Sequence, residues 1–244
     1  MNVSDFNNFA YFPPPAAHGA RRILIKPNLG YPFPSPVTVS LPVLERVIEG
    51  LRAVNPSAEI LIVEGVCHRL SAEEIATHLG LKRDGITFLD ADQLPLATYR
   101  NPRATPTRFR EFQAPALLRE VDCRISLGTC KWTLLNQRPL FSGCIKNLYG
   151  LLPRSVYRAR SPHSRGQLHR PNVWQVIEDV SATFTPLFDG GIVDATQVLV
   201  SPNWRPDRGQ KFPLDQIFWG QNLQEVDHAA MARSQEFMSI KSNT

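Results

Sequence analysis

The chain has 244 residues, a formal net charge of +5 and a hydrophobic fraction of 43%. This length supports a sizeable buried core in one large domain or two small ones, and the composition is that of a globular protein. No apolar run reaches the ~18 residues of a membrane-spanning helix, and the N-terminus lacks the basic start and apolar stretch of a secretory signal. We therefore expect neither membrane insertion nor secretion.

The first half of the chain alternates short apolar runs with amphipathic segments. Residues 1–20 are polar and Pro-rich, and we expect them to form a loose leader before a single domain over residues 21–244. Buried strands are predicted at 22–28, 59–65 and 86–90. One helix is predicted between Ser40 and Asn55-Pro56, and another at 71–80, where the spacing of Ser71 and Glu74 is that of a capping box.

The second half continues this alternation after a Pro/Arg-rich connection at 91–112. Strands are predicted at 123–128, 188–195 and 197–201. Helices are predicted at 114–121, within 141–150, after Asn172 and around 221–237. Short apolar strands alternating with helices predict an α/β fold, with a mostly parallel sheet flanked by helices in a single domain.

The cysteines give no sign of a metal centre. Cys67, Cys123, Cys130 and Cys144 show no CxxC spacing, so neither a zinc site nor an iron–sulfur cluster is expected. Reduced thiols in a cytoplasmic protein are the simpler interpretation.

Unusual polar groups follow three of the predicted strands. Lys26 and Asn28 end the first strand, Glu64 ends the second and is followed by His68, and Lys131 follows the strand at 123–128. In open α/β sheets, ligands bind in the crevice beyond the carboxyl ends of the strands. We therefore expect these groups to lie along one edge of the sheet and to bind a ligand there.

The segment FSGCIKNLYG, residues 141–150, is predicted to join the same edge. Ser142 and Gly143 would leave backbone N–H groups unpaired at a helix start, which favours an anion. Lys146, one turn further and beside Asn147, could bind that anion. A partly desolvated lysine near other cations also loses proton affinity and can act as a nucleophile or base. The alternative is an exposed Lys146 beside residues that only begin and end a helix.

Three histidines are candidates for the site. His68 could move protons near neutral pH or bind a metal, although a histidine after a strand is more often structural. His163 and His169 lie in the basic loop, residues 154–170, which holds five arginines and no acid. That loop could bind nucleic acid or an anionic small molecule, or simply be solvated. A nucleic-acid role ranks last because no helix-turn-helix, zinc finger or RNP-like motif is present.

Several segments resemble the domain of unknown function 362 family. They include RILIKPN with the helix after it, EILIVEG, CRISLGTCKWTLLNQRPLFSGCIKNLYGLLP, FDGGIVDA and FWGQNLQEVDHAAM, and together they cover residues 22–232. The chain departs from the family pattern where Lys131 is followed by Trp132 and Thr133 in place of a histidine. It also lacks the iron–sulfur cysteine cluster that some members carry.

A more distant resemblance is to the nickel-pincer-dependent lactate racemase family. VEGVCHRLSAEEIATHLG and FSGCIKNLYG are similar to two of its segments. The resemblance implies that His68 is an acid/base, that Lys146 anchors the cofactor and that His163 binds nickel. Lys26-Pro27-Asn28 replaces the racemases' DxTR segment, and one of their two catalytic histidines has no counterpart. We interpret the likeness as shared ancestry of the site without shared racemization, because a fold does not imply its chemistry.

Together these features predict an enzyme of unassigned reaction that binds an anionic small molecule or cofactor in the crevice, with the basic loop closing over it. The predicted catalytic residues are His68, Lys131 and Lys146. The predicted ligand-binding residues are Lys26, Asn28, Glu64, Ser142, Gly143, Asn147 and His169, and His163 is the predicted metal ligand. The first alternative is a non-catalytic binding or assembly protein, and the second is nucleic-acid binding through the basic loop.

Overall fold

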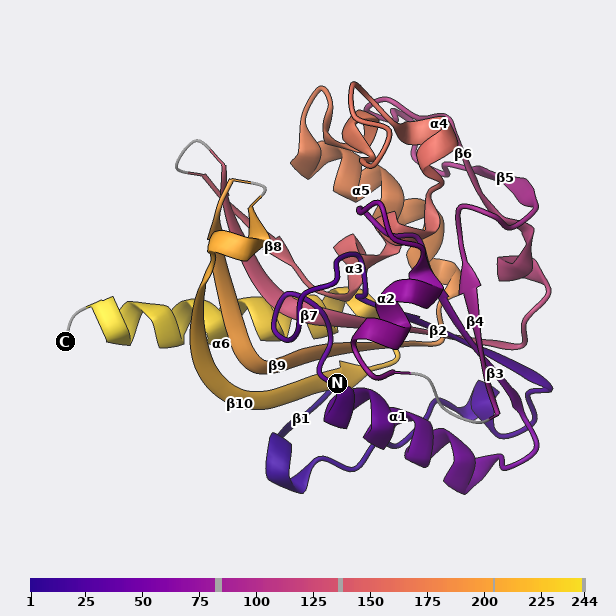
Figure 1. Cartoon of the computed structure of the whole chain (residues 1–244), viewed down its shortest axis with the longest axis vertical. Coiled ribbons are helices and arrows are strands. Elements are labelled where there is room, and N and C mark those ends of the chain that lie inside the picture. The colour runs from indigo at the N-terminus through magenta and orange to yellow at the C-terminus, as the bar shows by residue number, and fades with distance from the viewer. Residues whose placement is uncertain (82–84, 136–137, 204, 243–244) are drawn as a thin grey trace.

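A computed structural model describes residues 1–81, 85–135, 138–203 and 205–242 (Figure 1). Its centre is an eight-stranded sheet with strand order β1-β10-β9-β7-β2-β3-β4, in which β8 also pairs with β7. The strands are β1 Asn2–Asp5, β2 Arg22–Pro27, β3 Glu59–Glu64, β4 Ile86–Asp90, β7 Cys123–Leu135, β8 Arg138–Ser142, β9 Gly190–Pro202 and β10 Gln210–Gly220. A separate hairpin pairs β5 Leu96–Arg100 with β6 Glu111–Pro115.

The middle of the sheet is parallel, as predicted. Strands β4, β3, β2, β7 and β9 run parallel to one another. Strand β8 pairs antiparallel with β7, β10 with β9, and β1 with β10. The helices are α1 Leu41–Val54, α2 Ala72–His78, α3 Cys144–Asn147, α4 Arg154–Tyr157, α5 Val173–Phe184 and α6 Leu223–Ser242. Short 3-10 helices lie at Phe6–Asn8, Pro15–Ala17, Ala116–Arg119, Leu148–Leu151, Gly166–His169, Thr185–Leu187 and Pro206–Arg208.

Two apolar cores lie on opposite faces of the sheet. Alternate residues of β2 face opposite sides, so Ile23 and Ile25 pack with α1 while Leu24 packs in the other core. That other core includes residues of α3, α5, α6 and the β5–β6 hairpin. The sheet is therefore covered on both faces, which is what near-continuous apolar parallel strands require.

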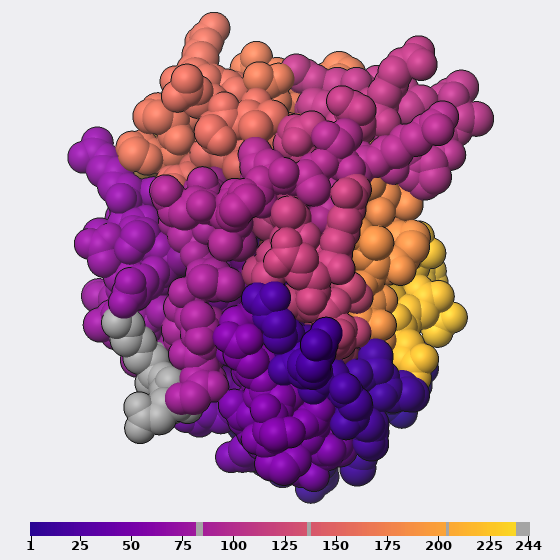
Figure 2. All heavy atoms as spheres, turned by 90° about the vertical axis from the view of Figure 1, so that its right-hand side faces the viewer, coloured from indigo at the N-terminus to yellow at the C-terminus, as the bar shows by residue number. Residues whose placement is uncertain are grey.

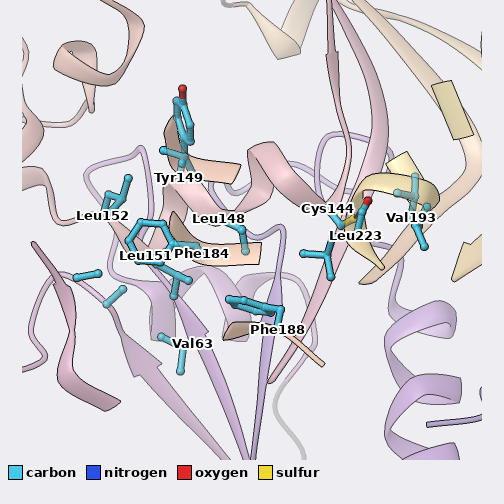
Figure 3. Packing of buried hydrophobic residues seen from close by; sticks show 14 of the residues in the cluster. Val63, Cys144, Leu148, Tyr149, Leu151, Leu152, Phe184, Phe188, Val193 and Leu223 are labelled. Carbon is cyan, nitrogen blue, oxygen red and sulfur yellow. Dashed lines mark hydrogen bonds between the residues drawn. The ribbon is translucent and has the colours of Figure 1, made fainter. Parts of the chain in front are cut away.

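Figure 3 shows part of this core, in which Val63 of β3, Cys144 of α3 and Phe184 of α5 are among the labelled side chains. Cys144 lies beside Leu223 of α6, and its thiol donates to the Leu223 carbonyl at 3.4 Å. The hydroxyl of Tyr149 is directed away from the apolar cluster and donates to the carbonyl oxygen of Leu168 at 3.1 Å. The Leu168 contact links this core to the basic loop.

Several elements differ from the sequence prediction. Residues 1–20, expected as a loose leader, contain β1 and bury the side chains of Phe9 and Tyr11 in the core. The connection at 91–112 contains β5 and the start of β6, and the helix expected at 114–121 is a 3-10 helix over Ala116–Arg119. The ranges 188–195 and 197–201 fall in one strand, β9, which stays paired with β7 as β7 continues to Leu135.

None of the described helices is both long enough and apolar enough to span a membrane. All four cysteines are free, as expected for reduced thiols. Figure 2 shows that the segment around the β5–β6 hairpin and the basic loop lie side by side at one end of the molecule. There, Nη1 of Arg108 donates to the carbonyl oxygens of Gln167 and Arg170 at 3.3 and 3.1 Å.

Candidate functional site

A cleft of about 690 Å³ lies where the parallel strands β2 and β3 end. Its walls come from the ends of these strands, the middle of β7, the turn into α3, the basic loop and the end of β9. The structure brings into this cleft all of the predicted site residues except His68. They are Lys26, Asn28, Glu64, Lys131, Ser142, Gly143, Lys146, Asn147, His163 and His169.

The long strand β7 creates the opening. Its first part pairs with β2 as far as Leu127, and its second part pairs with β8 from Lys131 onward. Between these two partners Gly128 lies against the turn into α3. A Cβ at Gly128 would lie 2.5 Å from the carbonyl carbon of Gly143, so only glycine permits this approach. The close contact places α3 and Lys146 over the gap in the sheet.

Lys26 and Glu64 form a buried ion pair at the floor of the cleft. Nζ of Lys26 lies 2.7 Å from Oε1 of Glu64, and both side chains are almost fully buried. The Glu64 carboxylate also accepts the backbone N–H groups of Leu29 at 2.7 Å and Gly65 at 2.9 Å. Burial lowers the pKa of Lys26, and the adjacent Glu64 opposes that shift. The two charges are therefore paired with each other at the floor of the cleft.

The two amide side chains at the site also bind to the protein itself. Nδ2 of Asn147 donates to the carbonyl oxygen of Lys26 at 2.6 Å and to Oγ of Ser126 at 3.0 Å, and its Oδ1 accepts from Nζ of Lys26 at 3.1 Å. Nδ2 of Asn28 donates to Oγ1 of Thr129 at 3.0 Å. These bonds hold α3 and β2 against β7, so the amides frame the cleft.

The start of α3 is occupied by a carboxylate of the chain. Oδ1 of Asp227 accepts the backbone N–H of Cys144 at 2.6 Å, and its Oδ2 accepts that of Ile145 at 3.0 Å. The anion that the sequence predicted for Ser142-Gly143 is therefore an internal side chain from α6. Burial raises the pKa of Asp227 to about 6, although these hydrogen bonds favour its charged form.

Lys131 and Lys146 are two further cations that line the cleft. Both side chains are partly buried, and Nζ of Lys131 donates to the carbonyl oxygen of Val37 at 2.9 Å. Burial lowers the pKa of Lys131 to about 7, with a further contribution from the charge of Lys146. Burial lowers the pKa of Lys146 to about 8, and its Nζ lies 4.8 Å from the centre of the Tyr149 ring. Both amines thus titrate near neutral pH.

The basic loop forms a wall of the cleft through Arg165, a residue that the sequence analysis did not select. Its buried guanidinium donates to the carbonyl oxygens of Leu152, Val66 and Gly150 and pairs with Asp92 at 3.4 Å. These contacts join the segments after β3, after β4 and after α3. Nothing in the sequence distinguishes Arg165 from the other four arginines of the loop.

His68 lies outside the group of residues that line the cleft. Its Nδ1 accepts the backbone N–H of Leu70 at 3.3 Å, and its carbonyl oxygen accepts from Nη1 of Arg154 at 2.9 Å. His169 does line the cleft, where burial, followed by the charge of Lys146, lowers its pKa to about 3. The imidazole of His169 is therefore neutral at physiological pH.

The described part of the chain contains no metal site built from protein side chains alone. Across the described ranges, no group of three or more His, Cys, Asp or Glu side chains could hold a metal ion. His163 lines the cleft on the basic loop. Under the racemase resemblance, His163 is the residue that would bind nickel, and Lys146 would anchor the cofactor.

Fold and cleft together define an α/β protein with a ligand-sized opening at the carboxyl ends of its parallel strands. The chain belongs to the family described as "Domain of unknown function (DUF362)", whose model matches residues 23–232. The predicted family membership is therefore confirmed. A comparison with curated protein sequences gives no match.

The fold is also similar to that of a solved racemase. The apoprotein of lactate racemase from Thermoanaerobacterium thermosaccharolyticum superimposes with a TM-score of 0.53 at 16% sequence identity. The match covers 92% of this chain and 52% of the racemase chain, so this chain spans about half the length of that structure. The predicted distant likeness holds for the fold.

Proposed function

We propose that this chain is an enzyme that binds an anionic small molecule in the cleft, with Lys146 and Lys131 as the cations that receive it. The observation that carries the proposal is the pairing of charges among the lining residues. Glu64 is the only carboxylate among the described residues that line the cleft, and it is bound to Lys26. The lining also holds Lys131, Lys146 and two arginines, so it is positively charged overall and favours an anionic ligand.

The electrostatics of these lysines support an anion. Burial of an ammonium group favours its neutral form, and a bound negative charge restores the charged form. Both lysines have pKa values near neutrality, about 7 and about 8. Anion binding above pH 7 should therefore take up protons from solution.

The size of the cleft supports a small ligand. Pockets for small molecules enclose roughly 300–1,000 Å³, and this cleft has about 690 Å³. The alternative of nucleic-acid binding by the basic loop has less support, because Arg154 and Arg165 are directed inward to Asp92. The alternative of a non-catalytic binding protein shares the same cleft and differs only in the absence of turnover.

The test is calorimetric titration of the protein with inorganic phosphate, pyruvate and a nucleoside monophosphate at pH 7. At least one of these anions should bind, and Lys146→Ala should weaken its affinity about tenfold or more, since a hydrogen bond to a charged group contributes roughly 1.5–3 kcal/mol. Lys211→Ala is the matched control, because Lys211 is exposed on β10 and does not line the cleft.

The free energy of unfolding separates a binding role from a structural one. Lys146→Ala should leave it within about 1 kcal/mol of the wild-type value, as expected for a residue outside the packed core. The proposal fails if none of the anions binds, if Lys146→Ala binds as the wild type does, or if this variant does not fold.

A further inference from the structure

Lys131 has an unusual set of neighbours for a lysine in a cleft. The register between β7 and β9 shifts between Thr129 and Lys131, where β7 passes from β2 to β8. At this point Lys131 lines the cleft, and its Nζ donates to the neutral carbonyl oxygen of Val37. Within the described part of the chain, no carboxylate lies within ion-pairing distance of this Nζ.

The carboxylate of Glu64, which also lines the cleft, is already bound to other groups of the protein. Glu64 holds Lys26 at 2.7 Å and accepts the backbone N–H groups of Leu29 and Gly65. Lys131 therefore has a neighbouring cation, Lys146, and a dipole, but no counter-ion of its own. Burial, and then the charge of Lys146, lowers the pKa of Lys131 to about 7, so a fraction of this side chain is a neutral amine near pH 7.

A neutral amine and a charged one then lie in the same opening. Lys131 pairs with Ser142 of β8, and Lys146 lies four residues after Ser142. Its pKa of about 8 keeps most of its side chain positive at pH 7. An amine with a free electron pair attacks carbonyl carbons, and an ammonium group binds carboxylates. A ligand with a carbonyl next to a carboxylate offers one group to each of the two amines that line the cleft.

We propose that Lys131 forms an imine with the carbonyl carbon of a 2-oxo acid whose carboxylate is bound by Lys146. This inference rests on the proposed function, since it requires the cleft to bind an anion. It goes further by naming the class of substrate, the nucleophile and the covalent step.

The step balances without an oxidant or a reductant. The electron pair on Nζ forms a bond to the carbonyl carbon, and the carbonyl oxygen takes up a proton to give a carbinolamine. A second proton, lost by the nitrogen, reaches the same oxygen, the C–O bond then breaks so that the oxygen leaves as water, and the nitrogen electron pair completes the C=N bond. The net reaction consumes one proton from solution and yields a protonated imine and one water molecule.

The imine is tested by reductive trapping. The whole protein is incubated with pyruvate and sodium cyanoborohydride at pH 7, and the adduct is located by intact-mass measurement and peptide mapping. The adduct should lie on Lys131. It should be lost in Lys131→Arg, which keeps the charge but lacks the nucleophile, and should fall about tenfold or more in Lys146→Ala as the carboxylate contact is lost.

Two controls define the background. Lactate, which has a hydroxyl in place of the carbonyl, should give no adduct. Lys211 reports non-specific labelling, because it is exposed and outside the cleft. An adduct confined to Lys146, or one no greater on Lys131 than on Lys211, overturns the assignment.

Titration with pyruvate in the absence of the reductant separates this inference from the proposed function. If pyruvate binds and no adduct forms on Lys131, the imine is excluded while anion binding stands. If phosphate binds and pyruvate does not, the substrate class is wrong. If no anion binds, the proposed function fails, and this inference fails with it.

Discussion

The carboxylate of Asp227 accepts the backbone N–H of Cys144 at 2.6 Å, so the C-terminal helix caps the single-turn helix that carries Lys146. Its second oxygen accepts the N–H of Ile145 at 3.0 Å. Such a short helix has little stability of its own. The orientation of Lys146 in the cleft therefore depends on a residue that lies far away in the sequence.

Removing this cap should weaken both the fold and the cleft. Asp227→Ala leaves two backbone donors without their acceptor, and loss of a helix cap costs about 0.5–2 kcal/mol. We expect a decrease of that size in the free energy of urea unfolding, together with weaker anion binding. His228→Ala, at the next and exposed position of α6, should change neither quantity. Wild-type stability in Asp227→Ala would show that the cap contributes nothing.

Lys131 should make the free energy of unfolding rise with pH, because burial lowers the pKa of its side chain. Its pKa is about 7 in the folded protein and near 10.5 in the unfolded chain. Between these values the unfolded chain binds more protons, so the contribution of Lys131 to the free energy of unfolding rises with pH. The contribution is smallest below pH 7 and reaches its full value near pH 10.5.

The measurement compares the wild type with Lys131→Met in urea at pH 7 and pH 9.5. The stability of the wild type relative to the variant should rise over this interval. Comparing the two proteins removes the opposing contributions of Cys123, Cys130 and Cys144, whose pKa values burial raises. A difference that is constant with pH would show that Lys131 keeps an ordinary pKa.

Local sequence patterns predicted the parallel centre of the sheet and the edge where polar residues gather. Periodicity identified β2, β3 and α1 because apolar side chains repeat along each of them. The predicted strand ends placed Lys26, Glu64 and Lys131 in one region, because parallel strands end at the same edge. Lys26 and Glu64 do lie at the ends of β2 and β3, but the strand expected to end at residue 128 continues to Leu135, so Lys131 lies within β7 where its partner changes from β2 to β8.

Pairing between distant residues could not be predicted in this way. Asp227 is separated from Cys144 by most of the second half of the chain, and no local pattern connects a helix residue to a distant cap. The sequence likewise gave no sign that Lys26, predicted as a ligand-binding residue, forms an ion pair with Glu64. The sequence analysis did not predict strand β10. This strand pairs with β9, and the pairing continues through a register shift that no local pattern reveals.

The buried pair of Lys26 and Glu64 should be costly to break and cheaper to replace. Lys26→Met leaves a buried carboxylate without its cation, and breaking such a pair costs about 3–5 kcal/mol. Glu64→Leu should cost a similar amount. The double variant should recover part of the loss, because the desolvation of both charges disappears together. The free energies of unfolding of the wild type, the two single variants and the double variant give the coupling energy between Lys26 and Glu64. If the losses of the two single variants add up in the double variant, the two residues do not act as a pair.

The planar shape of the Arg165 guanidinium should be necessary for its contacts in the wall of the cleft. Its donors reach the carbonyl oxygens of Leu152, Val66 and Gly150 and the carboxylate of Asp92. A lysine has the same charge but only three donors on one nitrogen, so it cannot reach acceptors that lie in several directions. Arg165→Lys should lower the free energy of unfolding by roughly 2 kcal/mol, the contribution of one or two hydrogen bonds to a charged group.

Arg160→Lys is the matched control, since Arg160 belongs to the same loop and is exposed. It should leave stability and anion binding unchanged. Arg165→Lys should also weaken anion binding, because the basic loop that bears His163 and His169 would lose its attachment to the segments after β3 and α3. Equal stability of the two variants would show that charge alone, and not the planar array of donors, holds this wall of the cleft.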